Sequence, residues 1–231
     1  MKAVLWDLDG TLVDSEPAHA AAFEAALREL GLRVPTGFHD GLLGASEDRV
    51  HAALVAQTGT VIDRAGWRAL KARHYRAAAG RIVRLPAADL IPPLARAGIA
   101  QAVVSNSTRA EVDHNLAVTG LAGSLSVTIS RDDVGLGKPD PEGYLAAARR
   151  LGTDAAECLV VEDSPTGAAA GLAAGMTTIF HSGITGLAVP DGALVPGPEG
   201  LAGLFGRLGL IAPGPGRTTD PDRRHPCSPH A

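Results

Sequence analysis

The chain has 231 residues, of which 45% are hydrophobic and 20% are charged, and its formal net charge is −4. A chain of this size and composition can bury a sizeable core in one or two domains. The weak net charge and the scarcity of aromatic residues argue against a partner that is a nucleic acid or a membrane, and no apolar run has membrane-spanning length.

The chain begins with a short apolar run, residues 3–6, which is followed by Asp7, Asp9 and Gly10. An apolar run closed by a turn signal predicts a buried strand, in which residues two apart point to the same side. Asp7 and Asp9 should therefore emerge together at the carboxyl end of the strand, where open parallel sheets bind ligands. Two adjacent carboxylates repel each other and are costly to bury, so we expect a hard cation such as Mg²⁺ near them.

Three helices without an intervening strand are predicted next. They cover residues 17–31, 47–57 and 64–79. Gly31 ends the first helix, and Ser46 and Asp63 are the N-caps of the second and third. We expect residues 16–81 to form an all-helical module inserted between the first strand and the rest of the chain.

Strands and helices then alternate. The predicted strands are 100–105, 126–130, 157–162 and 176–181. The predicted helices are 86–97, 141–151 and 165–174, and a capping box of Thr108 and Glu111 predicts the start of another. This alternation predicts an α/β fold with a parallel, right-handed, doubly wound sheet, built from residues 1–15 and 82–212. Residues 213–231 are rich in Pro, Gly and Arg and are predicted to be disordered.

Polar stretches in this alternating part lie next to predicted strand ends or helix starts. Ser105, Asn106 and Ser107 lead from a strand into a helix, where a hydroxyl and backbone N–H groups can bind phosphate, although Ser107 or Thr108 could serve only as a cap. Lys138 lies between Gly137 and Pro139, and the absence of a following Ser or Thr excludes a Walker A loop.

Two acidic residues, Glu162 and Asp163, end a later predicted strand. They could help to hold a cation, or one of them could cap the helix that starts at Pro165.

Four motifs resemble, in order, those of the haloacid dehalogenase-like (HAD) phosphotransferases: D-x-D-G-T-L-V-D-S from Asp7, V-S-N-S around Ser105, G-K-P-x-P around Lys138 and E-D-S-x-x-G from Glu162. The resemblance implies a Rossmann-like core with an inserted helical cap. It also implies that Asp7 is the nucleophile, that Asp9 is the general acid and base, and that Lys138 stabilises the aspartyl and phosphoryl charges.

The same resemblance implies the phosphate and metal ligands. Ser105, the amides near Asn106 and Lys138 would bind the transferring phosphoryl group. Mg²⁺ would be held by Asp7, by the backbone carbonyl of Asp9 and by Asp163, with Glu162 binding it directly or through water.

Asp9 distinguishes among members of the family, because haloacid dehalogenases and phosphonoacetaldehyde hydrolases lack an acid at that position. The enzymatic alternative is a β-phosphoglucomutase. The segment Asp14-Ser15-x-x-x-His19 resembles the hinge of that enzyme, but many sugar-phosphate phosphatases carry a similar string. The mutase uses a cap arginine soon after a G-x-S turn, whereas here the turn at 44–46 is followed by Glu47 and Arg49 comes two places late. We therefore expect hydrolysis of a small phosphorylated metabolite, in particular a sugar phosphate.

Substrate contacts from the cap are predicted for His19, Arg49 and Lys71. His19 could instead be a first-turn residue that faces solvent or Asp14, and for Lys71 and Tyr75 a solvated helix face is favoured. The non-enzymatic alternative is a phospho-aspartate receiver or an inactive binding protein. Receivers have no cap, and an inactive relative would usually have lost Asp9 or Lys138.

The cysteines indicate neither a disulfide framework nor a metal site, because Cys158 lies in an apolar run and Cys227 in the polar tail. Asp7 and Asp9 interrupt the N-terminus too early for a signal peptide. We expect a cytoplasmic, monomeric enzyme whose partner is a small-molecule phosphate ester.

Overall fold

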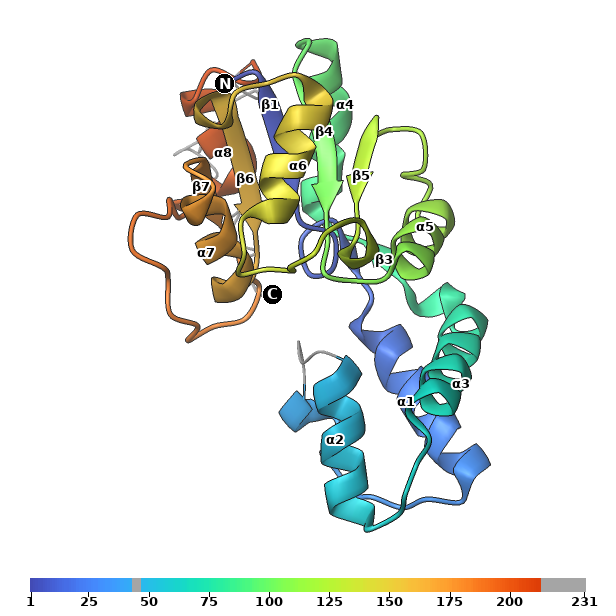
Figure 1. The fold of residues 1–231 in the computed structure, drawn as a ribbon. Coiled ribbons are helices and arrows are strands. Elements are labelled where there is room, and N and C mark those ends of the chain that lie inside the picture. The colour runs from blue at the N-terminus through green and yellow to red at the C-terminus, as the bar shows by residue number, and fades with distance from the viewer. Residues whose placement is uncertain (43–46, 213–231) are drawn as a thin grey trace, which may run out of the picture.

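Five parallel strands form the centre of the molecule, in the order β5–β4–β1–β6–β7. The structure is a computed structural model that describes residues 1–42 and 47–212 (Figure 1). The strands are β1 (Ala3–Trp6), β4 (Ala100–Val104), β5 (Val127–Ile129), β6 (Cys158–Glu162) and β7 (Thr177–Phe180). Because Trp6 pairs with Val103 of β4 and Val161 of β6, the residues that follow these three strands meet at one edge of the sheet.

Helices cover both faces of the sheet because side chains alternate along its strands. Val4 and Trp6 face a cluster that includes residues of α4 (Ile91–Arg96), α5 (Arg109–Val118) and α8 (Gly200–Arg207). Ala3 and Leu5 face the opposite cluster, with residues of α6 (Glu142–Leu151) and α7 (Pro165–Ala173). The predicted doubly wound α/β fold with a helical cap is confirmed, although the sequence analysis missed α8.

Segment 86–97, predicted as one helix, is divided in the structure. The chain forms a 3-10 helix, η3 (Pro86–Leu90), before α4 begins at Ile91. Pro92 and Pro93 explain the break, because they have no N–H to continue the preceding helix and are favourable in a first turn. Four shorter 3-10 helices connect other elements: η1 (Asp40–Leu42), η2 (Ala79–Arg81), η4 (Arg131–Asp133) and η5 (Ala155–Glu157).

The cap consists of α1 (Glu16–Leu30), α2 (Glu47–Thr58) and α3 (Arg64–Ala77), with α1 and α3 packed side by side (Figure 1). It has its own apolar cluster, in which Trp67 lies edge-on to Phe23 at 5.8 Å between ring centroids. The predicted N-cap Asp63 accepts a hydrogen bond from the Gly66 amide, 2.5 Å. Ser46 and the tail 213–231 lie outside the described residues, and the division at 16–81 stays a prediction.

Both connections between core and cap are short strands that pair with each other. β2 (Val13–Asp14) runs antiparallel to β3 (Val83–Arg84), with Val13 opposite Arg84. Strands of two residues carry no periodic pattern, so the sequence analysis did not predict them. Within the described ranges, no helix combines the length and apolar character that a bilayer crossing requires.

Candidate active site at the carboxyl edge of the sheet

Three acidic side chains and one lysine meet at the carboxyl edge of the sheet. Figure 1 shows that this edge faces the cap. Asp7 follows β1, and its amide donates to the carbonyl of Val161 on β6, 2.9 Å. One carboxylate oxygen from each of Asp7, Glu162 and Asp163 lies within 4.8 Å of the others. The structure therefore brings together residues from the first, third and fourth motifs.

The ammonium group of Lys138 uses all three of its protons in this cluster. Its Nζ donates to Oδ1 of Asp7 at 2.6 Å, to Oε1 of Glu162 at 2.5 Å and to the carbonyl of Val104 at 2.8 Å. Burial by itself lowers the pKa of Lys138, but the neighbouring Asp7 and Glu162 outweigh burial and raise it, so this lysine stays charged. A compact ammonium with three donors fits these acceptors, whereas the planar fork of an arginine would not.

Glu162 is fully buried and accepts from protein donors at both oxygens. Besides Lys138, the hydroxyl of Tyr144 donates to its Oε1 at 2.6 Å, and Ser164 donates to its Oε2 from its hydroxyl at 3.1 Å and from its amide at 3.4 Å. The carboxylate lies directly against α7, where any side chain at Gly167 would clash with it. The sequence analysis missed Tyr144, which is a buried residue of α6 and carries no motif of its own.

Asp7 and Asp163 form the part of the cluster that suits a cation. Oδ2 of Asp7 is a buried oxygen without a hydrogen-bond partner among the described residues. Burial and the nearby Glu162 raise the pKa of Asp7, and the same two causes raise the pKa of Asp163 to about 7. Three carboxylates against one ammonium leave excess negative charge in a buried space, and oxygen ligands of this kind fit Mg²⁺.

Gly10 permits Asp163 to approach the first motif. Its φ of +87° lies in the left-handed region, and a Cβ atom at this position would overlap Oδ2 of Asp163. A glycine is therefore required here both by the backbone conformation and by the space that the carboxylate occupies.

The carboxylate of Asp9 is held in a separate group of hydrogen bonds. Its Oδ1 accepts from the hydroxyl of Ser15 at 2.6 Å and from Nδ2 of Asn115 at 2.9 Å. Its Oδ2 accepts from the hydroxyls of Ser107 at 2.8 Å and Ser105 at 3.4 Å. Asp7 and Asp9 are thus neighbours in sequence that face different partners.

The second motif lies at the start of α5, between Asp9 and the loop of Lys138. The hydroxyl of Ser105 accepts from the Ser107 amide at 2.9 Å, while Thr108 and Glu111 form the predicted capping box. The side chain of Asn106 accepts from the amide of Lys138 at 2.9 Å and donates to its carbonyl at 3.2 Å. This bracing of the lysine loop by Asn106 was not predicted.

The predicted cap residues occupy three different environments. The ring of His19 stacks on Tyr75 with 4.3 Å between centroids, and Arg49 is exposed near the start of α2. Lys71 and Tyr75 are 8% and 2% exposed, so the solvated helix face favoured for them is wrong. Together with Trp67 they form a stripe at four-residue spacing, which places all three on one buried face of α3.

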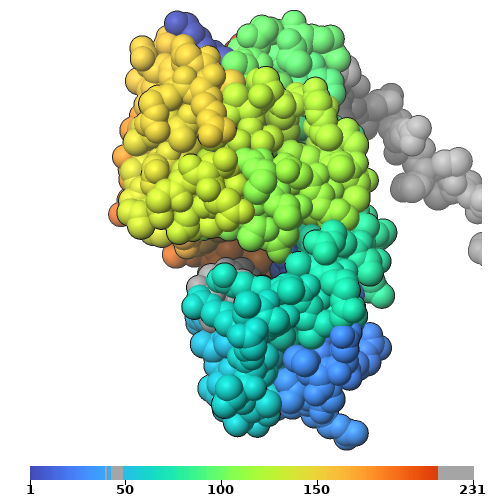
Figure 2. Space-filling view, turned by 45° about the vertical axis from the view of Figure 1, so that its right-hand side comes forward, coloured from blue at the N-terminus to red at the C-terminus, as the bar shows by residue number. Residues whose placement is uncertain are grey.

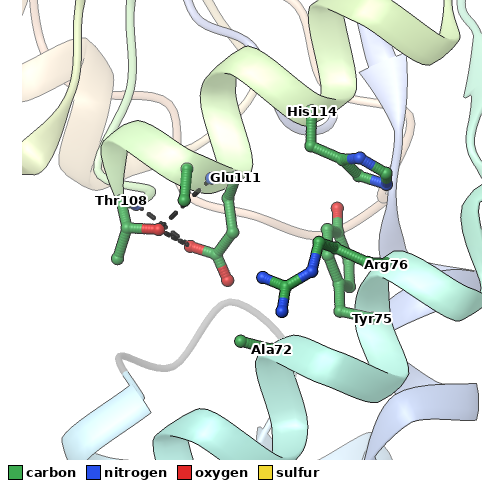
Figure 3. Close-up of a pocket in the computed structure, with 7 residues that line it drawn as sticks. Ala72, Tyr75, Arg76, Thr108, Glu111 and His114 are labelled. Atoms are coloured by element: carbon green, nitrogen blue, oxygen red, sulfur yellow. Dashed lines mark hydrogen bonds between the residues drawn. The ribbon is translucent and has the colours of Figure 1, made fainter.

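In the space-filling view, a furrow lies between the core and the cap along part of their junction, and elsewhere the two are in contact (Figure 2). A smaller hollow of about 30 Å³ lies between α3 and α5, lined by Ala72, Tyr75, Arg76, Thr108, Ala110, Glu111 and His114 (Figure 3). This hollow is far below the volume of a metabolite pocket, so the furrow is the better candidate for substrate entry.

Comparisons with known proteins agree with this arrangement. A family model described as haloacid dehalogenase-like hydrolase matches residues 1–175. The chain is 34% identical over 204 residues to a phosphoglycolate phosphatase of Cupriavidus necator, covering 86% of this chain and 87% of the relative. It is 33% identical over 192 residues to hexitol phosphatase A of Escherichia coli, covering 77% and 82%. The crystal structure of CbbY from Rhodobacter sphaeroides in complex with phosphate superposes with a TM-score of 0.77 at 26% identity, covering 88% of this chain and 99% of that one.

Proposed function

The chain belongs to the haloacid dehalogenase-like hydrolases and is a phosphatase of that family, and we propose that it hydrolyses a small phosphate ester, in particular a sugar phosphate, through a phosphorylated Asp7. The observation that carries this proposal is the meeting of Asp7, Asp163 and Lys138 at one edge of the sheet. The hexitol phosphatase among its relatives supports a phosphorylated polyol or sugar as substrate.

In the first half of the proposed reaction, a carboxylate oxygen of Asp7 attacks phosphorus in line. The bond from phosphorus to the ester oxygen breaks, and Asp9 protonates the departing alcohol oxygen. Ser105 and the amides near Asn106 donate to the phosphoryl oxygens, and the charge of Lys138 offsets theirs. Positioning and electrostatics supply most of the rate enhancement, as is usual for phosphoryl transfer.

In the second half, Asp9 is a carboxylate because it has given its proton to the alcohol, and it returns to its protonated form by accepting a proton from water. That water attacks the phosphorus of the aspartyl-phosphate, the acyl–phosphate bond breaks, and Asp7 is regenerated together with inorganic phosphate. Three hydroxyls and one amide group donate to Asp9, and this fixed position of its carboxylate supports a role in proton transfer.

Asp7, Asp163 and the backbone carbonyl of Asp9 would hold Mg²⁺, which when bound would neutralise charge on the phosphate oxygens. Oδ2 of Asp7, which is buried and has no hydrogen-bond partner among the described residues, supports this choice of ligands. For Glu162 we propose the indirect option, because four protein donors already occupy its carboxylate. Its role is then to hold Lys138 in place.

The test is an assay of p-nitrophenyl phosphate with and without Mg²⁺. Asp7→Asn should lower kcat/KM by more than about 1,000-fold, because it removes the nucleophile. Asp113→Asn is the matched control, because Asp113 is an exposed partner of Arg109 on the outside of α5 and should keep full activity. An active Asp7→Asn enzyme would remove the proposed nucleophile.

Metal binding has a separate readout in stability. Mg²⁺ should raise the melting temperature of the wild type and leave that of Asp163→Asn nearly unchanged, because a ligand stabilises the state that binds it. A sugar phosphate with a bisphosphate activator then separates the hydrolase from the mutase, since a hydrolase releases inorganic phosphate and a mutase returns an isomeric sugar phosphate.

A further inference from the structure

Asn115 connects the proposed acid and base to the cap. It lies on α5 and is fully buried, and both ends of its amide are used. Nδ2 donates to Oδ1 of Asp9 at 2.9 Å, and Oδ1 accepts from the hydroxyl of Tyr75 on α3 at 2.8 Å. Through these two bonds, Asn115 links the Asp9 carboxylate to α3.

The Asp9 carboxylate determines which end of the Asn115 amide faces it, because its oxygens only accept. The amide nitrogen donates to the carboxylate, so the amide oxygen is left to accept from the Tyr75 hydroxyl. If the amide were reversed, its oxygen would lie against a carboxylate oxygen and two acceptors would face each other. A buried amide in this orientation therefore holds the carboxylate, and the Tyr75 hydroxyl of the cap holds the amide in place through its oxygen.

Tyr75 is itself held by groups from both sides of the junction. Its ring stacks on His19 of α1 at 4.3 Å and lies 5.9 Å from His114 of α5. Figure 3 shows Tyr75 and His114 beside the small hollow between α3 and α5. The bond of 2.8 Å from the Tyr75 hydroxyl to Asn115 therefore forms only while this end of α3 lies against α5.

We propose that Asn115 and Tyr75 are positioning residues that orient the Asp9 carboxylate for proton transfer, so that this transfer depends on how the cap is seated on α5. The inference rests on the proposed function, in which Asp9 protonates the leaving oxygen. Neither residue touches the reacting atoms. Their effect should therefore appear where proton donation matters, and binding should change little.

The chemistry of the leaving group separates positioning of the acid from a purely structural role. p-Nitrophenolate departs without much help from an acid, whereas the alkoxide of a sugar phosphate needs a proton as it leaves. The parameter to compare is kcat/KM, which covers the steps up to the first departure of alcohol or phenol. The two substrates are p-nitrophenyl phosphate and the alkyl phosphate that the wild type hydrolyses fastest.

Tyr75→Phe is the main variant, because it removes the hydroxyl and keeps the ring on His19. For the alkyl phosphate it should lower kcat/KM by about 10- to 100-fold, a part of the full contribution of a general acid, and for the aryl phosphate by less than about threefold. Asn115→Leu should give the same pattern. Thr119→Val is the matched control: it removes a hydrogen bond from the Thr119 hydroxyl to the Asn115 carbonyl, 2.6 Å, and leaves the amide side chain alone.

A second comparison uses Asp9→Asn. If Tyr75 acts through Asp9, adding Tyr75→Phe to Asp9→Asn should cause no further loss on the alkyl phosphate, because residues that act as a unit are not additive. Equal losses on both substrates, no loss in Tyr75→Phe, or full additivity with Asp9→Asn would overturn the inference. A wild type inactive on both compounds would instead overturn the proposed function, and this inference with it.

Discussion

The carboxyl edge of the core sheet and the helical cap place their polar side chains in different ways. At the sheet edge, Asp7 and Glu162 come from two adjacent parallel strands, so backbone pairing alone brings them close together. In the cap, Lys71 and Tyr75 owe their positions to the packing of α3 against its neighbours. The comparison teaches that strand ends can be located from sequence, whereas the exposure of a helix face depends on partners that the sequence does not name.

A functional difference should accompany this structural one. We expect changes at the sheet edge to affect every substrate, and changes in the cap to alter binding of particular substrates. The chain has three lysines, which lie at the sheet edge (Lys138), in the cap (Lys71) and on the outer surface (Lys2). The same substitution to methionine can therefore be compared in all three regions.

Among the three lysines, the largest effect is expected for Lys138→Met. It leaves the buried carboxylates of Asp7 and Glu162 without their cation, so kcat/KM should fall by at least about 100-fold on every phosphate ester tested. Lys138→Arg should also fail, because three acceptors surround a compact ammonium. Steady-state kinetics on an aryl and an alkyl phosphate measures both variants, and a loss confined to one substrate would contradict the comparison.

A smaller and more selective effect is expected for Lys71→Met. If the cap attracts the anionic part of its substrate, KM should rise by about three- to tenfold while kcat stays within about twofold. The measurement is a set of saturation curves on several sugar phosphates. A loss of kcat as large as that of Lys138→Met would show that the two regions are not functionally separate.

A substitution of Asp133 tests whether a charged residue at the sheet edge but outside the site contributes to stability. Burial raises its pKa, but hydrogen bonds from Ser130 and the nearby Arg109 outweigh burial and lower it from 3.8 to about 2. A depressed pKa stabilises the fold above pH 3.8, and this stabilisation disappears as the pH falls toward 2. Asp133→Asn should therefore lower the urea midpoint at pH 7, with a shrinking difference from the wild type below pH 4 and unchanged kcat. A constant difference at all pH values would contradict this account.

The smallest effect is expected for Lys2→Met. The Lys2 side chain is 69% exposed, and its pairing with Glu157 at 2.9 Å is screened by water. Neither the urea midpoint nor kcat/KM should change measurably. A clear loss of activity would mean that methionine in place of lysine disturbs this protein wherever it is introduced, which would weaken the conclusions from Lys138.

Much of the core could be predicted because its signals are local. The run before Asp7 predicted β1, and Thr108 with Glu111 predicted the start of α5. The hydrogen bonds between the Asn106 side chain and the backbone of Lys138, by contrast, join residues 32 apart and depend on how two loops meet. Asn115 did leave a signal, since it is a polar residue beside Val112 and Leu116 on the buried face of α5.

The two-residue strands β2 and β3 give the cap an unusual degree of modularity. The chain leaves the core at Asp14 and returns at Val83, and these residues are paired partners. The segment between them joins the core covalently only at this pair of strands, so its exchange for the corresponding segment of a relative would leave all five core strands intact. Such a chimera should acquire the selectivity of the relative, and it should keep the full chemistry of this enzyme where the new segment also supplies a hydroxyl to Asn115.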